Sequence, residues 1–255
     1  MHFSSRFRQS LPVAAIHLGG SMVVAACLAA LILWAWYPHP YDAFSGGRTL
    51  FFLLIGVDMV CGPLLTLLLY TKSKPPKLLA LDFSLIFLLQ SAALGYGIAT
   101  AWYARPIYLV AEVDRFKAIS RSELASEDIA KLPSDLRTGI WKRPIIVGIR
   151  PPSSVQEKNS VLFESLQGGR DYAERPEFYI RYDAGSAGRT LTRAKRMEYF
   201  LEKHPDSRGW VEDYSSKSNI AIKDMKYLPI VAREDWIAIL DTNGYVAEFL
   251  KGDGF

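Results

Sequence analysis

The chain has 255 residues, half of them hydrophobic, with 30 basic and 26 acidic side chains. Six of the basic and three of the acidic residues precede residue 104, so the remaining 24 basic and 23 acidic residues nearly cancel. This balance excludes the basic surface that a nucleic-acid-binding domain needs.

Three apolar runs occupy the first hundred residues, and each has about the length that spans a bilayer, roughly 20 residues. We predict membrane helices at about residues 12–37, 49–70 and 78–103. The first run ends in Trp34-Ala-Trp36-Tyr37 and the third in Trp102-Tyr103, as is typical of helices that meet the membrane–water interface. The first run is also longer than the 7–15-residue core of a signal peptide. Residues 1–104 therefore predict a three-helix transmembrane module.

The basic residues predict how this module is oriented. Five of them flank the first and third helices on one side, whereas the connection over residues 37–47 has none; the five are Arg6, Arg8, Lys72, Lys74 and Lys77. Since basic loops stay in the cytoplasm, the N-terminus is expected inside and the chain after the third helix outside. In a bacterial inner membrane, the outer side is the periplasm.

Residues 105–255 have the composition and pattern of a soluble α+β domain. Short runs rich in β-branched residues predict strands, and segments with helical apolar spacing predict helices. The predicted strands are Pro106–Val113, Ile145–Ile149, Tyr227–Val231, Trp236–Leu240 and Tyr245–Leu250. The predicted helices are Ser120–Leu132, which opens with a Ser120–Glu123 capping box, Ser153–Leu166 and Thr190–Lys203. Asn243-Gly244 predicts a hairpin turn between the last two strands.

Four polar residues within the predicted spans are candidate functional residues. Asp58 lies near the middle of the second span, where a charged side chain costs at least about 2.5–3.5 kcal/mol. Counted from the cytoplasmic ends, Asp58 and Gln90 lie at one depth, and His17 and Asp82 at another, which predicts two polar pairs. These pairs could simply hold the helices together, or Asp58 could face a partner helix or a polar cavity. A proton or ion relay is the weakest alternative, because a single acid without basic partners or repeats makes a poor transporter.

Signals for catalysis or cofactor binding are missing from the sequence. There is no GxSxG motif, no phosphate-binding glycine pattern and no Cys/His cluster with metal-ligand spacing. Cys27 and Cys61 fall at different depths of their spans, which argues against a disulfide. We therefore expect a protein that is not an enzyme and that carries no cofactor or metal.

Several motifs resemble the type IV pilin accessory proteins of the TfpX/TfpZ type. They are WYPHPYDAFSGG after the first helix, VDMVCGPLLTLLLY, LDFSLIFLLQSAALGYG, RPIYLVAEVDRF at the domain start and YLPIVAREDWIAILDTNGYV near the end. The likeness covers nearly the whole chain and is looser between about Ile140 and Lys226. It implies an inner-membrane protein that binds its cognate major pilin and promotes pilin accumulation, assembly or pilus dynamics. It brings no catalytic residues.

Two classes of function follow. A pilin helper would need a membrane surface for the apolar helix of a pilin and an outer domain for the pilin head. The alternative is a membrane-anchored periplasmic enzyme, or a sensor, of unknown substrate. A clustered pocket of Asp, Glu or His side chains would favour the enzyme, whereas an exposed apolar groove or an open strand edge would favour the helper. Self-association, the pilin variant and the binding surface stay open.

Overall fold

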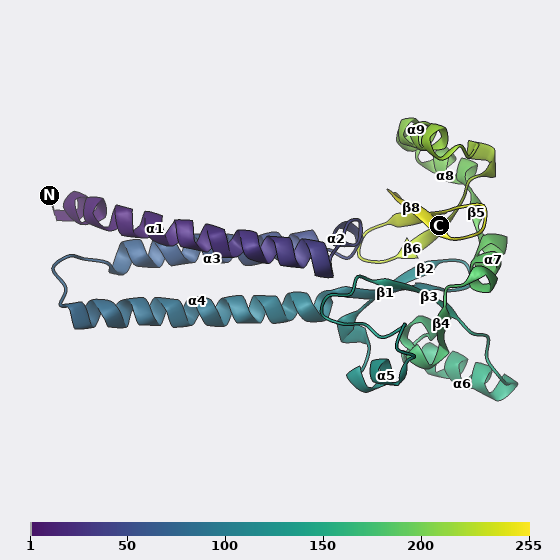
Figure 1. The fold of residues 1–255 in the computed structure, drawn as a ribbon, viewed down its shortest axis with the longest axis horizontal. Coiled ribbons are helices and arrows are strands. Elements are labelled where there is room, and N and C mark those ends of the chain that lie inside the picture. The colour runs from purple at the N-terminus through teal and green to yellow at the C-terminus, as the bar shows by residue number, and fades with distance from the viewer. Residues whose placement is uncertain (1) are drawn as a thin grey trace.

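A computed structural model describes residues 2–255, except for the side chains of residues 2–6, 48, 50, 51, 54 and 58. It has two parts (Figure 1): a set of long helices extends from one side of a mixed α+β domain, and the N-terminus lies at the far end of those helices. The C-terminus lies in the α+β domain.

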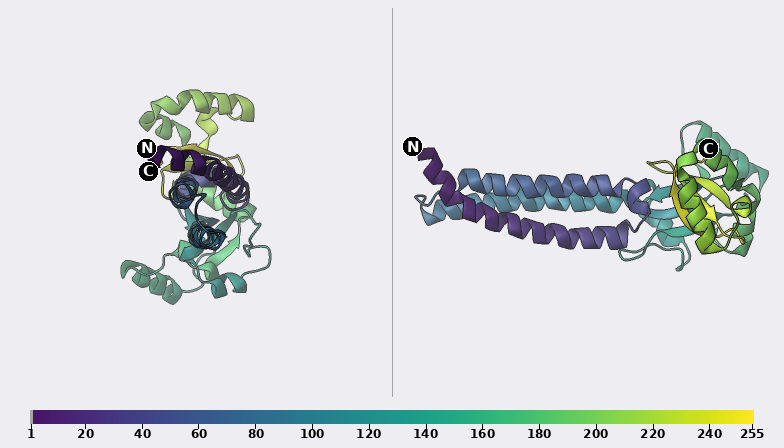
Figure 2. Two further views of the ribbon diagram at one scale, coloured as in Figure 1. Left: turned by 90° about the vertical axis from the view of Figure 1, so that its left-hand side faces the viewer. Right: turned by 90° about the horizontal axis from the view of Figure 1, so that it is seen from above.

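Three long helices form the first part. They are α1 (His2–Leu31), continued by the π-helical turn η1 (Ile32–Trp36), α3 (Gly47–Leu69) and α4 (Pro76–Ala104). The three lie side by side along most of their length (Figures 1 and 2). Helix α1 begins ten residues before the start that the apolar run predicted, and it continues through Pro12.

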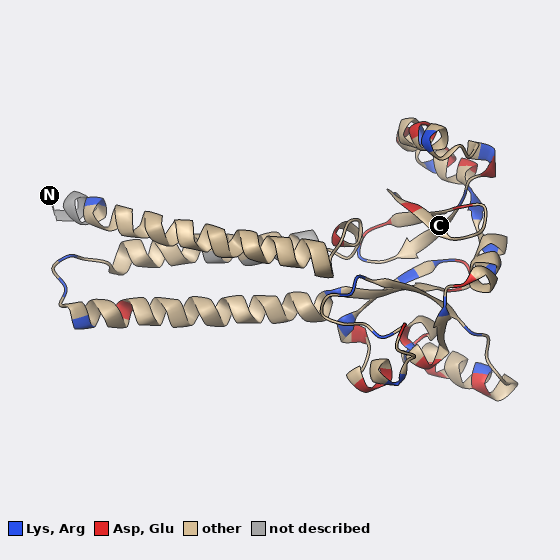
Figure 3. Cartoon of the chain, in the orientation of Figure 1, with Lys and Arg blue, Asp and Glu red and all other residues tan. Residues whose placement is uncertain are grey.

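Two of these helices are long and apolar enough to cross a bilayer. They are the Phe7–Trp36 segment and Pro76–Ala104, whereas the apolar stretch described in α3 is shorter, Ile55–Leu69. In Figure 3, the charged residues on the described parts of the long helices lie only near the end away from the sheet. The structure thus supports two candidate spans, and the predicted third span stays a proposal.

The second part is built on one mixed sheet in the order β4-β3-β1-β2-β6-β7-β8, with β5 also paired to β6. Strand β1 is parallel to β3, and β2 is parallel to β6, while the other pairs are antiparallel. The strands are β1 (Pro106–Ala111), β2 (Phe116–Ser120), β3 (Ile145–Ile149), β4 (Tyr179–Arg181), β5 (Lys195–Arg196), β6 (Lys226–Val231), β7 (Trp236–Leu240) and β8 (Val246–Lys251).

Short helices cover this sheet near its two ends (Figure 1). They are α5 (Ser126–Lys131), α6 (Val155–Leu166), α7 (Ala184–Arg193), α8 (Met197–Lys203) and α9 (Arg208–Ser218). Helix α5 packs on β1 and β3, and α8 and α9 pack on β6 and β7, each through its own apolar cluster. The expected α+β class is confirmed for this part.

A third apolar cluster joins the two parts. Helix α2 (Tyr41–Phe44) lies in the connection between α1 and α3, and it places Tyr41 and Phe44 among buried side chains of β1, β6 and β7. The sheet core therefore includes residues from the segment that the sequence assigned to the membrane module.

Two of the three predicted helices of the domain differ from the structure. Residues 120–132 form β2's last residue, a 3₁₀ turn with the expected Ser120–Glu123 capping box, and a separate helix α5. The Thr190–Lys203 helix is wrong: α7 ends at Arg193, and β5 separates it from α8. The reason is that Leu191 packs in one apolar cluster and Met197 in another, which one straight helix face could not reach.

Candidate functional site

A polar cluster joins all three long helices. The His17 Nδ1 of α1 lies 2.6 Å from the hydroxyl of Thr66 on α3, and its Nε2 lies 2.8 Å from Oε1 of Gln90 on α4. Since a carbonyl oxygen only accepts, Nε2 donates to Gln90, and a neutral ring can accept the Thr66 hydroxyl proton at Nδ1. Where helices lie in a bilayer, hydrogen bonds of this kind between them are worth about 0.6–2 kcal/mol each.

Gly62 makes this cluster possible. A side chain at Gly62 would collide with the Gln90 amide and press on the His17 ring. The absence of a side chain lets two polar groups approach the backbone of α3, so the small size of Gly62, and not its backbone angles, is what this close packing uses.

The predicted pairing of His17 with Asp82 is wrong. Asp82 instead bonds Lys74 in the loop between α3 and α4, with Nζ and Oδ2 2.6 Å apart. The cause is the early start of α1, which moves His17 deeper along the bundle, to the level of Gln90. The side chain of Asp58 lies outside the described residues, so its pairing with Gln90 stays a prediction.

The helices meet the domain through aromatic and basic side chains. The Tyr37 hydroxyl donates to the Ala101 carbonyl at 3.0 Å, which ties the end of η1 to α4. The Trp36 and Trp102 rings pack edge to face with centroids 5.1 Å apart, and the Arg105 guanidinium lies 3.7 Å from the centre of the Trp102 ring. The predicted interfacial aromatics therefore include buried structural ones such as Trp36 and Tyr37.

In the domain, helix α6 turns its apolar stripe away from the sheet. Val155, Leu162 and Leu166 share one stripe at 3.6 residues per turn, with Phe163 at its edge. Their exposed fractions are 69%, 50%, 75% and 61%, in that order. The stripe lies almost opposite Val161, which is buried. Exposed apolar side chains gathered on one helix face can form a surface that binds a partner.

Ion pairs hold the other face of α6. Arg150 donates to both oxygens of Glu157, at 3.0 and 2.8 Å, and its guanidinium lies 4.3 Å from the centre of the Phe178 ring. The Ser153 backbone N–H donates to the same carboxylate at 2.5 Å. Through these bonds, above all those from Arg150, the pKa of Glu157 falls to about 2.

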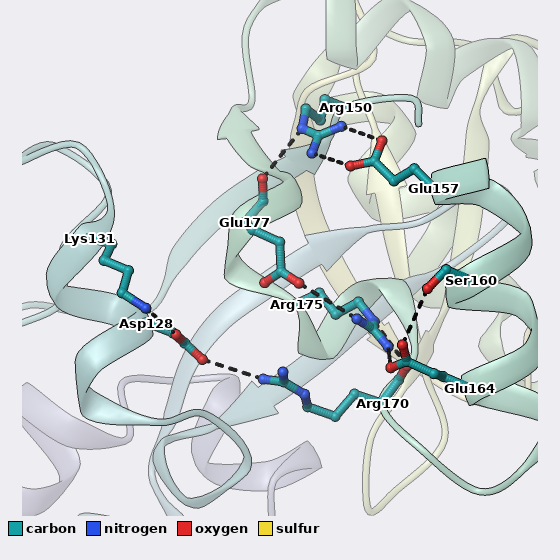
Figure 4. Close-up of polar contacts among 9 residues, drawn as sticks. All are labelled: Asp128, Lys131, Arg150, Glu157, Ser160, Glu164, Arg170, Arg175 and Glu177. Atoms are coloured by element: carbon teal, nitrogen blue, oxygen red, sulfur yellow. Dashed lines mark hydrogen bonds and ion pairs between the residues drawn. The ribbon is translucent and has the colours of Figure 1, made fainter. Parts of the chain in front are cut away.

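A second group of charges extends this network to α5 (Figure 4). Arg175, whose side chain is nearly buried, bonds Glu164 of α6 and lies 3.6 Å from Glu177. Asp128 of α5 pairs with Lys131 at 3.0 Å and with Arg170 at 3.4 Å. Polar contacts thus fix the position of α6 and leave its apolar stripe accessible. The sequence predicted the helix and its apolar spacing, but periodicity would have placed the stripe against the sheet.

The open edges of the sheet are a less suitable surface. Strand β4 is only three residues long. On β8 the Phe249 N–H donates to the carboxylate of Glu248 at 2.9 Å, so this donor is already used within the chain. Charged residues that occupy an edge in this way hinder pairing with another strand.

Among the hollows on the described part of the chain, two lie against α1. One is lined by residues of the C-terminal part of α1 and η1, and the other by residues near the two chain segments 8–13 and 70–72. Neither lining includes a carboxylate or a histidine. Among the residues described, no three His, Cys, Asp or Glu side chains are grouped to hold a metal.

Comparison with known proteins identifies the family. The family model of the fimbrial assembly protein FimB matches residues 5–46, from α1 to the end of the α2 turn. The protein is 29% identical to the "Fimbrial assembly protein, serogroup I" of Dichelobacter nodosus, with 98% of both chains covered. It is 40% identical over 124 residues to the serogroups C1 and C2 protein of that organism, which covers 49% of this chain and 95% of the relative. The chain belongs to the FimB family of fimbrial assembly proteins.

This membership confirms the resemblance to pilin accessory proteins that the sequence motifs indicated. No solved structure matches the chain. The matched segment of the FimB-family protein contains His17 and the α2 helix.

Proposed function

We propose that this FimB-family protein binds its cognate type IV major pilin at the bacterial inner membrane and promotes pilin accumulation, assembly or pilus dynamics. The relatives are named fimbrial assembly proteins, which supports a role in pilus assembly. The observation that carries the pilin-binding step is the exposed apolar stripe of α6, held in place by ion pairs.

The proposal places α1, α3 and α4 across the membrane, with the N-terminus in the cytoplasm and the sheet domain in the periplasm. A pilin has an apolar helix in the bilayer and a head outside it. The protein then has one surface within the bilayer and one outside it: the faces of its long helices for the pilin helix, and α6 for the pilin head. Asp58 of α3 is the proposed contact within the membrane, while Gln90 is bonded to His17 and has a structural part as well.

Site-specific photocrosslinking tests the proposal in cells that assemble pili. A photoreactive residue replaces Phe163 or Leu166 on α6, and the control replaces Tyr199, which is 58% exposed on α8. Crosslinks to the major pilin from α6 but not from Tyr199 are expected. Equal yields at all three positions, or none from α6, would contradict the assignment of α6.

A double variant supplies the second test. Phe163→Ser with Leu166→Ser removes apolar area that is mostly exposed, so the melting temperature should change little while capture of pilin falls. Val161→Ala is the matched control, because it truncates the buried residue of the same helix. It should lower stability by about 0.5–2 kcal/mol and leave pilin capture in the folded fraction intact.

A further inference from the structure

The loop over residues 138–143 is held at the ends of two long helices. Trp36 at the end of η1 donates its indole N–H to the Ile140 carbonyl at 3.1 Å. Arg105, directly after α4, donates to the carbonyls of Ile140 and Gly139 at 3.3 and 3.2 Å. The loop belongs to the sheet domain in sequence, yet its backbone is bonded to the residues where the candidate spans end.

The side chains of this loop face outward. Ile140 and Trp141 are 53% and 67% exposed, and Lys142 and Arg143 are exposed beside them. Lys142 also donates to the Arg137 carbonyl at 2.7 Å, which closes the loop. An isoleucine and a tryptophan are therefore presented together at the tip of a loop with a defined backbone.

The helix ends nearby carry further exposed aromatic residues. Trp34 is 66% exposed at the end of the first candidate span, and Tyr103 is 56% exposed at the end of the second. Tryptophan and tyrosine favour the headgroup level of a bilayer, where the ring is buried and its polar atom stays hydrated. Trp141 lies near these helix ends, because the backbone of its neighbour Ile140 is bonded to Trp36 and Arg105.

We propose that the 138–143 loop is a membrane anchor: Ile140 and Trp141 insert into the headgroup region of the leaflet where α1 and α4 end, and Lys142 and Arg143 bind phosphates of anionic lipids. This inference rests on the membrane placement under Proposed function. One observation favours lipid over a protein partner. The backbone of the loop is bonded to the residues where the candidate spans end, so its exposed apolar side chains lie at the level of those ends. The anchor fixes the tilt of the sheet domain, and thereby of α6, relative to the bilayer.

Spin-label accessibility in the full-length protein tests the anchor. In a Cys27→Ala, Cys61→Ala background, single cysteines replace Trp141, Tyr103 or Trp210 and carry a nitroxide. The proteins are reconstituted in vesicles of phosphatidylethanolamine and phosphatidylglycerol. The ratio of collision rates with oxygen and with a water-soluble nickel chelate should be several-fold higher at 141 than at 210 on α9, and similar to that at 103. Replacing Lys142 by the labelled cysteine keeps Trp141 and should also give a raised ratio.

The controls separate this inference from the proposal on which it rests. A raised ratio at 103, together with ratios at 141 and 142 as low as that of the water-exposed residue 210, would overturn the anchor but not the membrane placement. Aqueous ratios at 103, 141 and 142 would overturn both. With the label at 142, Ile140→Ser with Trp141→Ser should lower the ratio to the aqueous value, whereas Trp210→Ser should not change it. If the double substitution left the ratio at 142 unchanged, the two apolar side chains would not be the anchor.

Discussion

The backbone carbonyl of Phe44 accepts the N–H of Arg233 at 3.0 Å, which bonds the connection between α1 and α3 to the turn between β6 and β7. The Phe44 ring is fully buried, and it packs against Trp236 and Phe249 with centroid distances of 6.1 and 6.0 Å. A residue from the connection between two long helices is therefore part of the core of the sheet domain.

Phe44→Ala should destabilise the domain by about 3–5 kcal/mol, because it leaves a cavity between β6, β7 and α2. Thermal melting of the full-length protein in detergent measures the loss. Trp34→Ala, at a position that is 66% exposed, serves as the control and should leave the melting temperature nearly unchanged. Equal effects of the two substitutions would show that the α2 contact does not stabilise the domain.

Since residues 105–255 have the pattern of a soluble domain, we expect Arg105–Phe255 to fold without the long helices. The structure adds that such a fragment lacks Tyr41 and Phe44 from its core. We expect a cooperative but low melting temperature, which a synthetic peptide of residues 37–47 raises by binding the folded state. A fragment that ignores the peptide would contradict this role of α2.

Gly62→Ala should disrupt the polar cluster of the long helices, because the added methyl group would collide with Gln90 and crowd His17. We expect lower thermal stability in detergent and a lower steady-state level in the membrane. Gly56→Ala on the same helix is the matched control, since a methyl group there meets no other atom. Equal melting temperatures for the two variants would show that close packing at Gly62 does not contribute to stability.

Asp58→Asn tests whether a charge in the second helix recognises the pilin. The amide keeps the shape of the side chain and can still bond Gln90, so the variant should accumulate like the parent. If the charge binds pilin, the pilin level and surface piliation fall. Leu54→Asn, one turn earlier, controls for the placement of an amide in the bilayer. Normal piliation at parental protein levels would end the idea of charge recognition.

Alkaline phosphatase fusions test the proposed topology, because this enzyme is active only outside the cytoplasm. A fusion after Phe255 should be active, and one after Lys74 should be inactive. Activity after Lys74 together with inactivity after Phe255 would reverse the orientation that the basic residues predict.

The Arg150–Glu157 pair should make the attachment of α6 sensitive to acid. The folded-state pKa of Glu157, about 2, lies below the ordinary 4.5, so the pair contributes stability above pH 4.5. That contribution is lost as the pH falls toward 2. Amide hydrogen-exchange protection of α6, corrected for the intrinsic rate, should drop between pH 5 and pH 3, because the Glu157 carboxyl of the unfolded state becomes protonated over this range. In Glu157→Gln, the protection of α6 should already be lower at pH 6 and should change less with pH. An equal drop in both proteins would show that the Arg150–Glu157 pair does not cause the pH dependence.

The sequence by itself determined the elements whose signals are local. Apolar length predicted the long helices, β-branched runs predicted β1, β3, β6, β7 and β8, and the Asn243-Gly244 turn closes its hairpin with Gly244 at φ 88°. The quoted motifs alone were also enough to indicate the family, which the comparisons show. Each of these features depends only on residues that are close together in the sequence, so no knowledge of distant contacts is needed to predict it.

Tertiary structure alone decided which residues meet. His17 pairs with Thr66 and Gln90 because the start of α1 sets its depth, and no count from the apolar run includes the ten earlier helical residues. The apolar stripe of α6 faces outward because Arg150 and Arg175, distant in sequence from one another, bond the carboxylates on its other face. Helical periodicity reports that a stripe exists, but the direction in which it points depends on the partners of the opposite face, and only the folded chain brings those partners together.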